Sequence, residues 1–121
     1  MLRDDVLEFI RSLIKTVWSL ELLLLMRRTA QCTWTSDELI KELRSSRNIV
    51  SDTVTVFVQA GILREEEAGF RYAPAAPELD QLIEELAREY AERPTSVINT
   101  IVDAQSGKLQ AFANAFRLKR D

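Results

Sequence analysis

Apolar residues recur three and four positions apart along most of the chain, which is the pattern of amphipathic helices. The first such segment runs from about Asp4 to Lys15 and predicts a helix with one apolar face. A second helix is expected to take Ser19 as its N-cap and to end at Arg28, because basic side chains favour a helix C-terminus. Its centre, residues 22–26, is apolar on nearly every side, so this helix is expected in the middle of the core.

A third helix is predicted by a start signal of its own. Thr35-Ser36-Asp37-Glu38 has the order of a capping box, in which the Thr35 hydroxyl accepts from the Glu38 amide and the Glu38 carboxylate reaches back. The polar run Ser45-Ser46-Arg47-Asn48 favours a turn after this helix. Before the capping box, residues 33–35 are expected to form a very short strand, because threonine and tryptophan favour extended backbone.

Residues 49–60 fit two kinds of secondary structure. Thr53 to Val58 alternate and are rich in β-branched side chains, as in a strand, and each of these costs a helix up to about 0.7 kcal/mol relative to alanine. Apolar residues nevertheless fall at helical spacing from Val50 to Phe57, and Gly61 stands where a helix C-terminus favours glycine. The local preferences for strand and helix are both weak, so the packing of this segment against the rest of the chain decides between them. We favour a helix from Ile49 to Ala60.

A β-hairpin is predicted directly after this segment. Residues 62–65 and 70–73 have the composition of short strands, and Glu66-Glu67-Ala68-Gly69 between them has the composition of a hairpin turn. The hairpin therefore carries three consecutive carboxylates, those of Glu65, Glu66 and Glu67.

The C-terminal part of the chain is predicted to be helical. Pro77 suits the first turn of a helix, and an apolar stripe extends that helix to Tyr90. Pro94 either ends this helix or starts the next one, for which Thr95 is a suitable cap. Two further apolar stripes, separated by an expected break at Ser106-Gly107, consist of Val97, Ile98, Ile101 and Val102, and of Leu109, Phe112, Ala113 and Phe116.

Three stretches of the sequence resemble a known family. They are Trp34-Thr35-Ser36-Asp37-Glu38-Leu39, Asn48-Ile49-Val50-Ser51 and Val58-Gln59-Ala60-Gly61-Ile62-Leu63. With the predicted order of elements, they resemble the winged helix-turn-helix superfamily, and most closely regulators of the MarR and PadR kind. The resemblance implies one mostly helical α+β domain over residues 1–121, with a short three-stranded sheet in a core of residues 19–75. The N-terminal helix of residues 1–18 and the helices of residues 76–121 are then additions, which build the homodimer in these families.

The resemblance also implies a DNA-binding site. In these families the third helix of the motif lies in the major groove, where its exposed N-terminal residues contact base edges. The residues placed at the DNA by this resemblance are Arg44, Arg47, Asn48, Ser51 and Thr55, with Arg64 and Arg71 in the hairpin. Arg47 would bind phosphate or guanine, and Asn48 would bind adenine. Asp52 and the three hairpin glutamates depart from the pattern, because they place negative charge where phosphates would lie.

Composition limits the classes of function. The chain has 16 basic and 19 acidic residues and a net charge of −3, so it lacks the basic excess typical of nucleic-acid-binding domains. It has no histidine and one cysteine, Cys32, which argues against zinc sites, catalytic triads and internal disulfides. We therefore expect no enzymatic activity, no catalytic or metal-binding residues and no cofactor, and a cytoplasmic location. No apolar run has the length of a membrane span.

The aromatic and thiol side chains are expected to have structural roles. Trp18 and Trp34 are predicted to pack in the core, and Cys32 is predicted to be an inert buried thiol, since no histidine is present to activate it.

Two functions follow from these patterns. The first is a homodimeric transcriptional regulator whose helix of residues 49–60 binds double-stranded DNA. The alternative is a winged-helix module that binds a protein partner through the β-branched face of that helix. A continuous positive surface over Arg44, Arg47, Arg64 and Arg71 would favour DNA, and a broken or negative surface would favour a protein.

Overall fold

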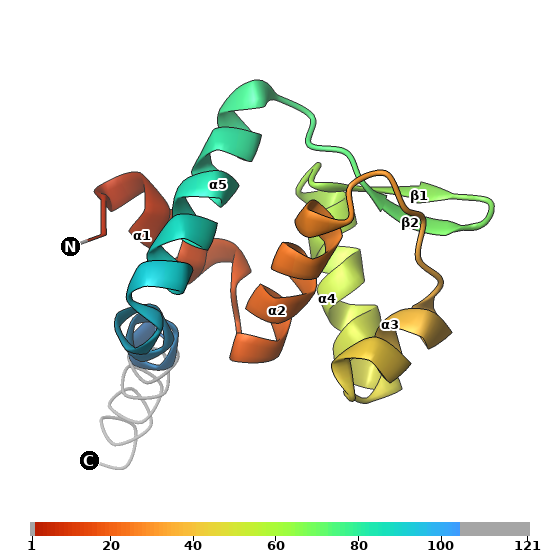
Figure 1. The fold of residues 1–121 in the computed structure, drawn as a ribbon, viewed down its shortest axis with the longest axis horizontal. Coiled ribbons are helices and arrows are strands. Elements are labelled where there is room, and N and C mark those ends of the chain that lie inside the picture. The colour runs from red at the N-terminus through yellow and green to blue at the C-terminus, as the bar shows by residue number, and fades with distance from the viewer. Residues whose placement is uncertain (1, 105–121) are drawn as a thin grey trace, which may run out of the picture.

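The computed structural model describes residues 2–104 and places one helix, α2, between two groups of elements (Figure 1). In chain order the elements are α1 (Asp4–Leu13), α2 (Val17–Arg28), α3 (Ser36–Leu43), α4 (Arg47–Gln59), β1 (Leu63–Glu66), β2 (Gly69–Tyr72) and α5 (Pro77–Glu92), and residues 94–104 are also helical. Helices α1 and α5 lie on one side of α2, and α3, α4 and the hairpin lie on the other. This is the mostly helical α+β architecture predicted from the sequence.

The core is centred on α2. Five of its apolar side chains are buried: Leu20, Leu22, Leu23, Leu25 and Met26. The helix contacts α3, α4 and β2. Full burial of one such side chain contributes about 1.5–3 kcal/mol, so α2 fixes the positions of the elements around it. The prediction that the second helix occupies the middle of the core is confirmed.

The start of α2 differs from the prediction. Thr16, and not Ser19, is the N-cap: its hydroxyl accepts from the Ser19 amide at 3.1 Å, and the Ser19 hydroxyl accepts from the Thr16 amide at 3.1 Å. The prediction was wrong because Ser19 fills the third helical position of a capping box, which glutamate or glutamine usually occupies. The expected boundary at residue 18 therefore falls inside α2, and α1 already ends at Leu13.

Residues 47–59 are helical, which confirms the helical interpretation of the ambiguous segment. Helix α4 begins at Arg47, two residues before the predicted start, because the Ser46 hydroxyl accepts from the Ile49 amide at 3.2 Å and caps it. The residues that α4 buries are Val50, Val54 and Phe57. A strand would instead have turned alternate residues inward. Gly61 follows the helix with a φ of +79°, as expected after a helix C-terminus.

The described residues form two strands instead of the three expected. Strands β1 and β2 are antiparallel, but residues 33–35 contribute only one bridge, between Trp34 and Phe70. The Trp34 amide donates to the Phe70 carbonyl at 2.8 Å, and the Phe70 amide donates back at 2.7 Å. This pairing cannot extend, because Thr35 is the N-cap of α3 and the Cys32 amide closes a turn on Thr29.

The C-terminal helices close the other side of the core. Pro77 lies in the first turn of α5, as predicted, and Pro94 begins the next helical segment, so that Thr95 lies inside this segment instead of capping it. In that segment Val97 and Ile101 are buried, Ile98 is half-buried and Val102 is exposed. The predicted break at Ser106-Gly107 and the stripe from Leu109 to Phe116 lie outside the described residues. Within residues 2–104 we find no helix with the length and apolarity that a membrane crossing requires.

Tyr72 ties the end of β2 to α5. Its ring is buried, and its hydroxyl donates to Asp80 Oδ1 at 2.6 Å. Burial first, and the hydrogen bond to Asp80 second, raise the pKa of Tyr72 far above its ordinary value. The folded state therefore holds this proton more tightly than the unfolded chain, in which a tyrosine pKa is about 10. The stabilisation is complete below about pH 10 and is lost as the pH rises above that value.

We expect the Tyr72→Phe variant to lose less stability in alkali than the parent. Its free energy of unfolding should be lower at neutral pH, because the hydrogen bond to Asp80 is gone. Above about pH 10 the parent should decline more steeply than the variant, since Tyr72 ionises near pH 10 in the unfolded chain but keeps its proton in the folded state. Urea unfolding at a series of pH values measures both curves, and parallel declines would refute this role of Tyr72.

Candidate nucleic-acid interface

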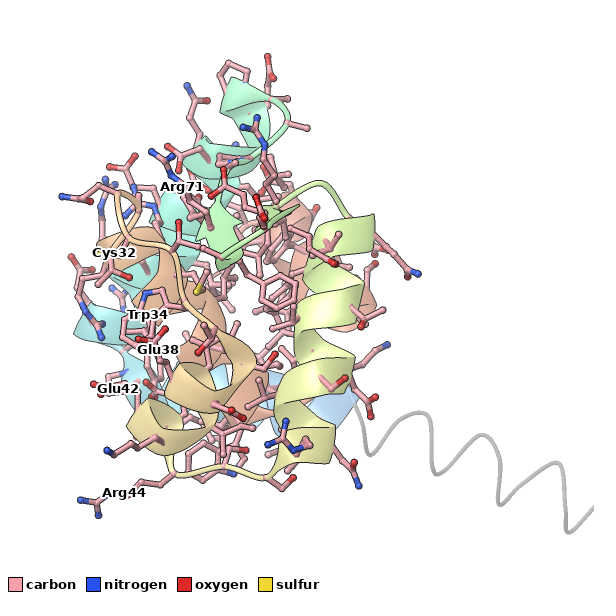
Figure 2. The ribbon with its side chains drawn as sticks, turned by 90° about the vertical axis from the view of Figure 1, so that its right-hand side faces the viewer. Cys32, Trp34, Glu38, Glu42, Arg44 and Arg71 are labelled. Atoms are coloured by element: carbon pink, nitrogen blue, oxygen red, sulfur yellow. The ribbon has the colours of Figure 1, made fainter. Side chains whose placement is uncertain are left out.

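A tight turn at Arg44 sets the geometry of α3 and α4. Arg44 has φ 52° and ψ 42°, in the left-handed region, which costs a non-glycine residue about 1–2 kcal/mol. The Ser45 amide donates to the Ile40 carbonyl at 3.1 Å, and Ser46 then caps α4. The turn leaves the Arg44 side chain pointing into solvent at the end of the α3–α4 pair (Figure 2).

One face of α4 is polar and exposed along its length. Asn48, Ser51, Thr55 and Gln59 are all exposed and fall three or four residues apart. The Thr55 hydroxyl donates to the Ser51 carbonyl oxygen at 2.8 Å. The side chains of Asn48 and Ser51 make no hydrogen bond within residues 2–104, so they are available to a ligand. Asp52 is exposed beside this face, as expected, and adds a carboxylate to it.

Arg47 lies in the first turn of α4 and is engaged in an ion pair. Its Nη2 atom is 2.7 Å from Oδ1 of Asp37 in α3, and the two side chains are 70% and 78% exposed. An ion pair so exposed contributes at most about 1 kcal/mol. A phosphate group can therefore compete with Asp37 for this guanidinium. Sequence reasoning missed the pair, because its partners are ten residues apart and on different helices.

The outer face of the hairpin combines both signs of charge. Arg64 of β1 stands directly opposite Arg71 of β2, an arrangement of like charges that disfavours strand pairing. The Arg71 Nε donates to the Ala30 carbonyl at 3.3 Å. Glu66 lies two residues along from Arg64, on the same face, and accepts from the Thr33 hydroxyl at 3.1 Å. Glu67 lies at the turn and is exposed.

The positive surface that would favour DNA is interrupted. Figure 2 shows Arg44 and Arg71 at opposite ends of one view of the molecule, with Glu38 and Glu42 of α3 between them. The structure thus brings Arg44, Arg47, Asn48, Ser51 and Thr55 together around α4, and it places Arg64 and Arg71 apart from them on the hairpin. Gln59 extends the polar face by one more turn, and its spacing of four residues from Thr55 was visible in the sequence.

A mostly apolar hollow lies beside the polar face of α4. It is lined by Ile49, Thr53 and Val56 of α4, and by Leu13 and Thr16 from the end of α1 and the start of α2. Ile49 is 38% exposed, whereas Thr53 and Val56 are half-buried. The β-branched side of α4 therefore borders a hollow that the end of α1 also lines, and Ile49 remains accessible there.

Two side chains expected inside the molecule lie at its surface. Trp18 is 45% exposed, because it stands on the outer side of α2 in the first turn. Cys32 is exposed, since it follows α2 in the turn that its amide closes on Thr29. Trp34 is half-buried and packs against the core, and its indole donates to the Thr29 hydroxyl at 2.9 Å. Among residues 2–104, no cluster of three or more metal-ligating side chains occurs.

Comparison of the chain with family models, with curated proteins and with solved structures yields no significant match.

Proposed function

We propose that this protein is a winged helix-turn-helix regulator that binds double-stranded DNA through α4, with β1 and β2 as its wing. The observation that carries the proposal is the exposed polar face of α4, which follows directly on the α3–α4 turn. Amide and hydroxyl groups such as those of Asn48 and Ser51 bind base edges, and an α-helix fits the major groove. Arg44 and Arg47 at the start of α4, and Arg64 and Arg71 on the hairpin, supply phosphate contacts.

The surface around α4 has little net positive charge, and this limits its affinity for DNA of arbitrary sequence. Non-specific affinity comes almost entirely from the phosphate contacts of basic side chains. This surface offers four arginines, interleaved with the carboxylates of Asp37, Asp52 and the hairpin. Binding to arbitrary sequences is therefore weak, and base contacts by α4 contribute a large share of the affinity for the correct sequence.

A homodimer is part of the proposal. The α1–α5 contact and the helical segment of residues 94–104 lie on the side of α2 away from α3, and Val102 leaves an apolar side chain 51% exposed there. A twofold contact through these terminal helices would present two copies of α4 to successive major grooves, about 34 Å apart. Two weak half-sites then combine into one stronger site.

Enrichment from a pool of random duplexes tests the proposal. The full chain, immobilised at about 50 mM salt to retain phosphate contacts, should select a recurring inverted repeat. The Asn48→Ala variant should select a motif with relaxed preference at one position of each half-site, because a lost amide–base contact costs about 1–3 kcal/mol of discrimination. Repeated selection that enriches no motif would refute sequence-specific binding by this chain.

The hairpin carboxylates should oppose DNA binding. We expect Glu67→Gln to raise the affinity for DNA about two- to fivefold at low salt, because one exposed carboxylate near a phosphate costs about 0.5–1 kcal/mol. Glu8→Gln, the same change on the exposed surface of α1, should leave the affinity unchanged. Fluorescence anisotropy measures both variants. An unchanged affinity in Glu67→Gln would place the hairpin away from the DNA.

A protein partner is the second candidate function. The interrupted positive surface and the accessible Ile49 beside the hollow between α1 and α4 favour it. A pull-down with the full chain would then recover one partner in stoichiometric amount, and Val56→Asp or Ile49→Asp would abolish the recovery. Recovery that survives both substitutions would exclude α4 as the contact surface.

A further inference from the structure

A hollow opens to solvent between the first turns of α2 and the end of α3. Five side chains line it: Val17, Trp18 and Glu21 of α2, and Glu42 and Leu43 of α3. Helices α2 and α3 are in contact, so the two walls are held in a fixed relation to each other. The volume of the hollow is about 460 Å³, which is within the range of sites that hold small ligands.

The hollow contains an aromatic ring that the fold leaves uncovered. Trp18 is 45% exposed, although it belongs to α2, the helix at the centre of the core. Its indole makes no hydrogen bond within residues 2–104, whereas the indole of Trp34 donates to Thr29. Val17 and Leu43 are half-buried and continue the apolar surface around it. The face of an indole ring is electrostatically negative, so this wall of the hollow attracts cations.

The charged groups of the hollow are both negative. Glu42 is exposed, and it makes no ion pair or hydrogen bond within the part of the chain that the structure describes. Glu21 accepts from the Tyr90 hydroxyl at 2.7 Å, which orients its carboxylate without neutralising it. The basic residues of α3, Lys41 and Arg44, do not line the hollow. A cation in the hollow would therefore meet an unpaired carboxylate and no positive side chain.

The partial charges of the two helix ends oppose each other at this place. The C-terminal end of α3, where Glu42 lies, is partially negative, and the N-terminal end of α2, where Trp18 lies, is partially positive. The Thr16 hydroxyl accepts from the Ser19 amide at 3.1 Å and so satisfies one of the free amides of α2. Because the two helix ends offset each other, the carboxylates decide the sign of the potential in the hollow, and it favours a cation.

The apolar lining favours a quaternary ammonium ion over other cations. Primary ammonium and guanidinium groups carry several N–H donors, which lose their water when they enter an apolar site. The side chains of Val17, Trp18 and Leu43 offer no hydrogen-bond acceptor to replace that water. A trimethylammonium group has no N–H donor, and its positive charge is covered by methyl groups. It can therefore contact the indole face and the apolar wall together.

We propose that this hollow binds a small quaternary ammonium ion, with its methyl groups against Trp18 and Leu43 and its charge balanced by Glu42. A free ion fits better than a methylated peptide, because α2 and α3 offer no sheet edge to hold a peptide backbone. The carboxylates oppose a phosphocholine headgroup, whose phosphate would lie beside Glu42. No residue of α4 lines the hollow, so the inference stands independently of DNA binding.

The two indole signals of the full chain report on this binding. Choline chloride is titrated into isotope-labelled protein, with sodium chloride keeping the ionic strength constant, and nuclear magnetic resonance follows the indoles, which Trp18→Phe assigns. We expect a saturable shift of the Trp18 signal with a Kd of about 1–10 mM, because one exposed cation–π contact and one carboxylate attract the ion only modestly. The Trp34 signal should stay in place, since its indole donates to Thr29 at the other end of α2.

Matched ligands separate the charge of the ion from its shape. The neutral analogue of choline, in which a tert-butyl group replaces the trimethylammonium group, should bind at least about fivefold more weakly, because the attraction to Glu42 is lost. Phosphocholine should also bind more weakly than choline. Equal binding of the neutral analogue, or a Trp18 shift that does not saturate, would overturn the proposal. Tighter binding of phosphocholine or of a trimethyllysine peptide would also overturn it, since the hollow would then serve a lipid headgroup or a methylated protein.

A pair of exposed carboxylates provides the matched variants. Glu42→Gln should weaken choline binding about fivefold, which is the effect of one unit charge at about 4 Å in water. Glu67→Gln makes the same change on the hairpin and should leave the Kd unchanged. Both side chains are exposed, so neither substitution should disturb the fold. An equal Kd in the parent and in Glu42→Gln would show that Glu42 does not balance the charge of the ion, and the proposed site would be wrong.

Discussion

Replacement of Gly69 by alanine should lower the free energy of unfolding by about 3 kcal/mol or more. A Cβ atom at this position would lie 2.3 Å from the carbonyl oxygen and 2.7 Å from the carbonyl carbon of Trp34. The backbone of Trp34 has little freedom to move, because it makes two hydrogen bonds to Phe70 and is followed by the N-cap of α3. Gly69 also has φ +143°, which L side chains rarely adopt. The substitution must therefore break the bridge that joins the hairpin to the start of α3.

Gly61→Ala provides the matched control for this effect. Gly61 has φ +79°, so alanine there carries about 1–2 kcal/mol of backbone strain. Its Cβ atom would meet only the Cβ of Ala75, at 3.2 Å, which requires a small adjustment. Urea unfolding of the parent and both variants should therefore rank Gly69→Ala as clearly the less stable variant. If Gly61→Ala were as damaging, the close approach of Gly69 to Trp34 would not be the cause.

Ser51→Glu should lower the affinity for the selected DNA sequence about a hundredfold, because it loses a hydrogen-bonding hydroxyl and places a carboxylate against phosphates and base edges. Ser51 is exposed in the middle of the polar face of α4. For the same reason the substitution should change the free energy of unfolding by less than about 0.5 kcal/mol. Fluorescence anisotropy and urea unfolding measure the two quantities on the same preparation.

Gln81→Glu is the control for the change of charge. Gln81 is exposed on α5, across α2 from α3 and α4, and the substitution adds the same carboxylate. Charges further away than the Debye length of about 8 Å at physiological ionic strength are largely screened, so the affinity should remain close to that of the parent. A loss of equal size in both variants would mean that net charge, and not the face of α4, governs the binding.

The elements that could be predicted from sequence are those with local chemical signals. The Thr35–Glu38 capping box forms as expected, with the Glu38 amide donating to Thr35 at 3.1 Å, and Gly61 ends the region of α4. The burial of α2 followed from its apolar composition. The N-cap of α2 was predicted wrongly because serine suits both the N-cap and the third helical position. Thr16, three residues before Ser19, is the N-cap, so Ser19 takes the third position.

The features that escaped prediction depend on contacts between elements. The ion pair of Arg47 with Asp37 arises from the angle that the turn at Arg44 imposes on α3 and α4. The exposure of Trp18 depends on which side of an almost wholly apolar helix faces its neighbours, and the apolar pattern of α2 gives no preference. The short pairing of Trp34 results from competition with the α3 cap for neighbouring residues.

If α4 and its flanking arginines bind double-stranded DNA, as we propose, a salt-dependent anisotropy titration of the full chain on the selected duplex should show it. Each phosphate contact contributes a slope of about −0.9 to the dependence of log affinity on log salt. With four arginines available, we predict binding at about 50 mM salt with a slope no steeper than about −4 per chain, and a slope shallower by about one in Arg44→Ala and in Arg47→Ala. Absence of binding at low salt, or binding with an affinity and slope that neither substitution changes, would contradict the claim.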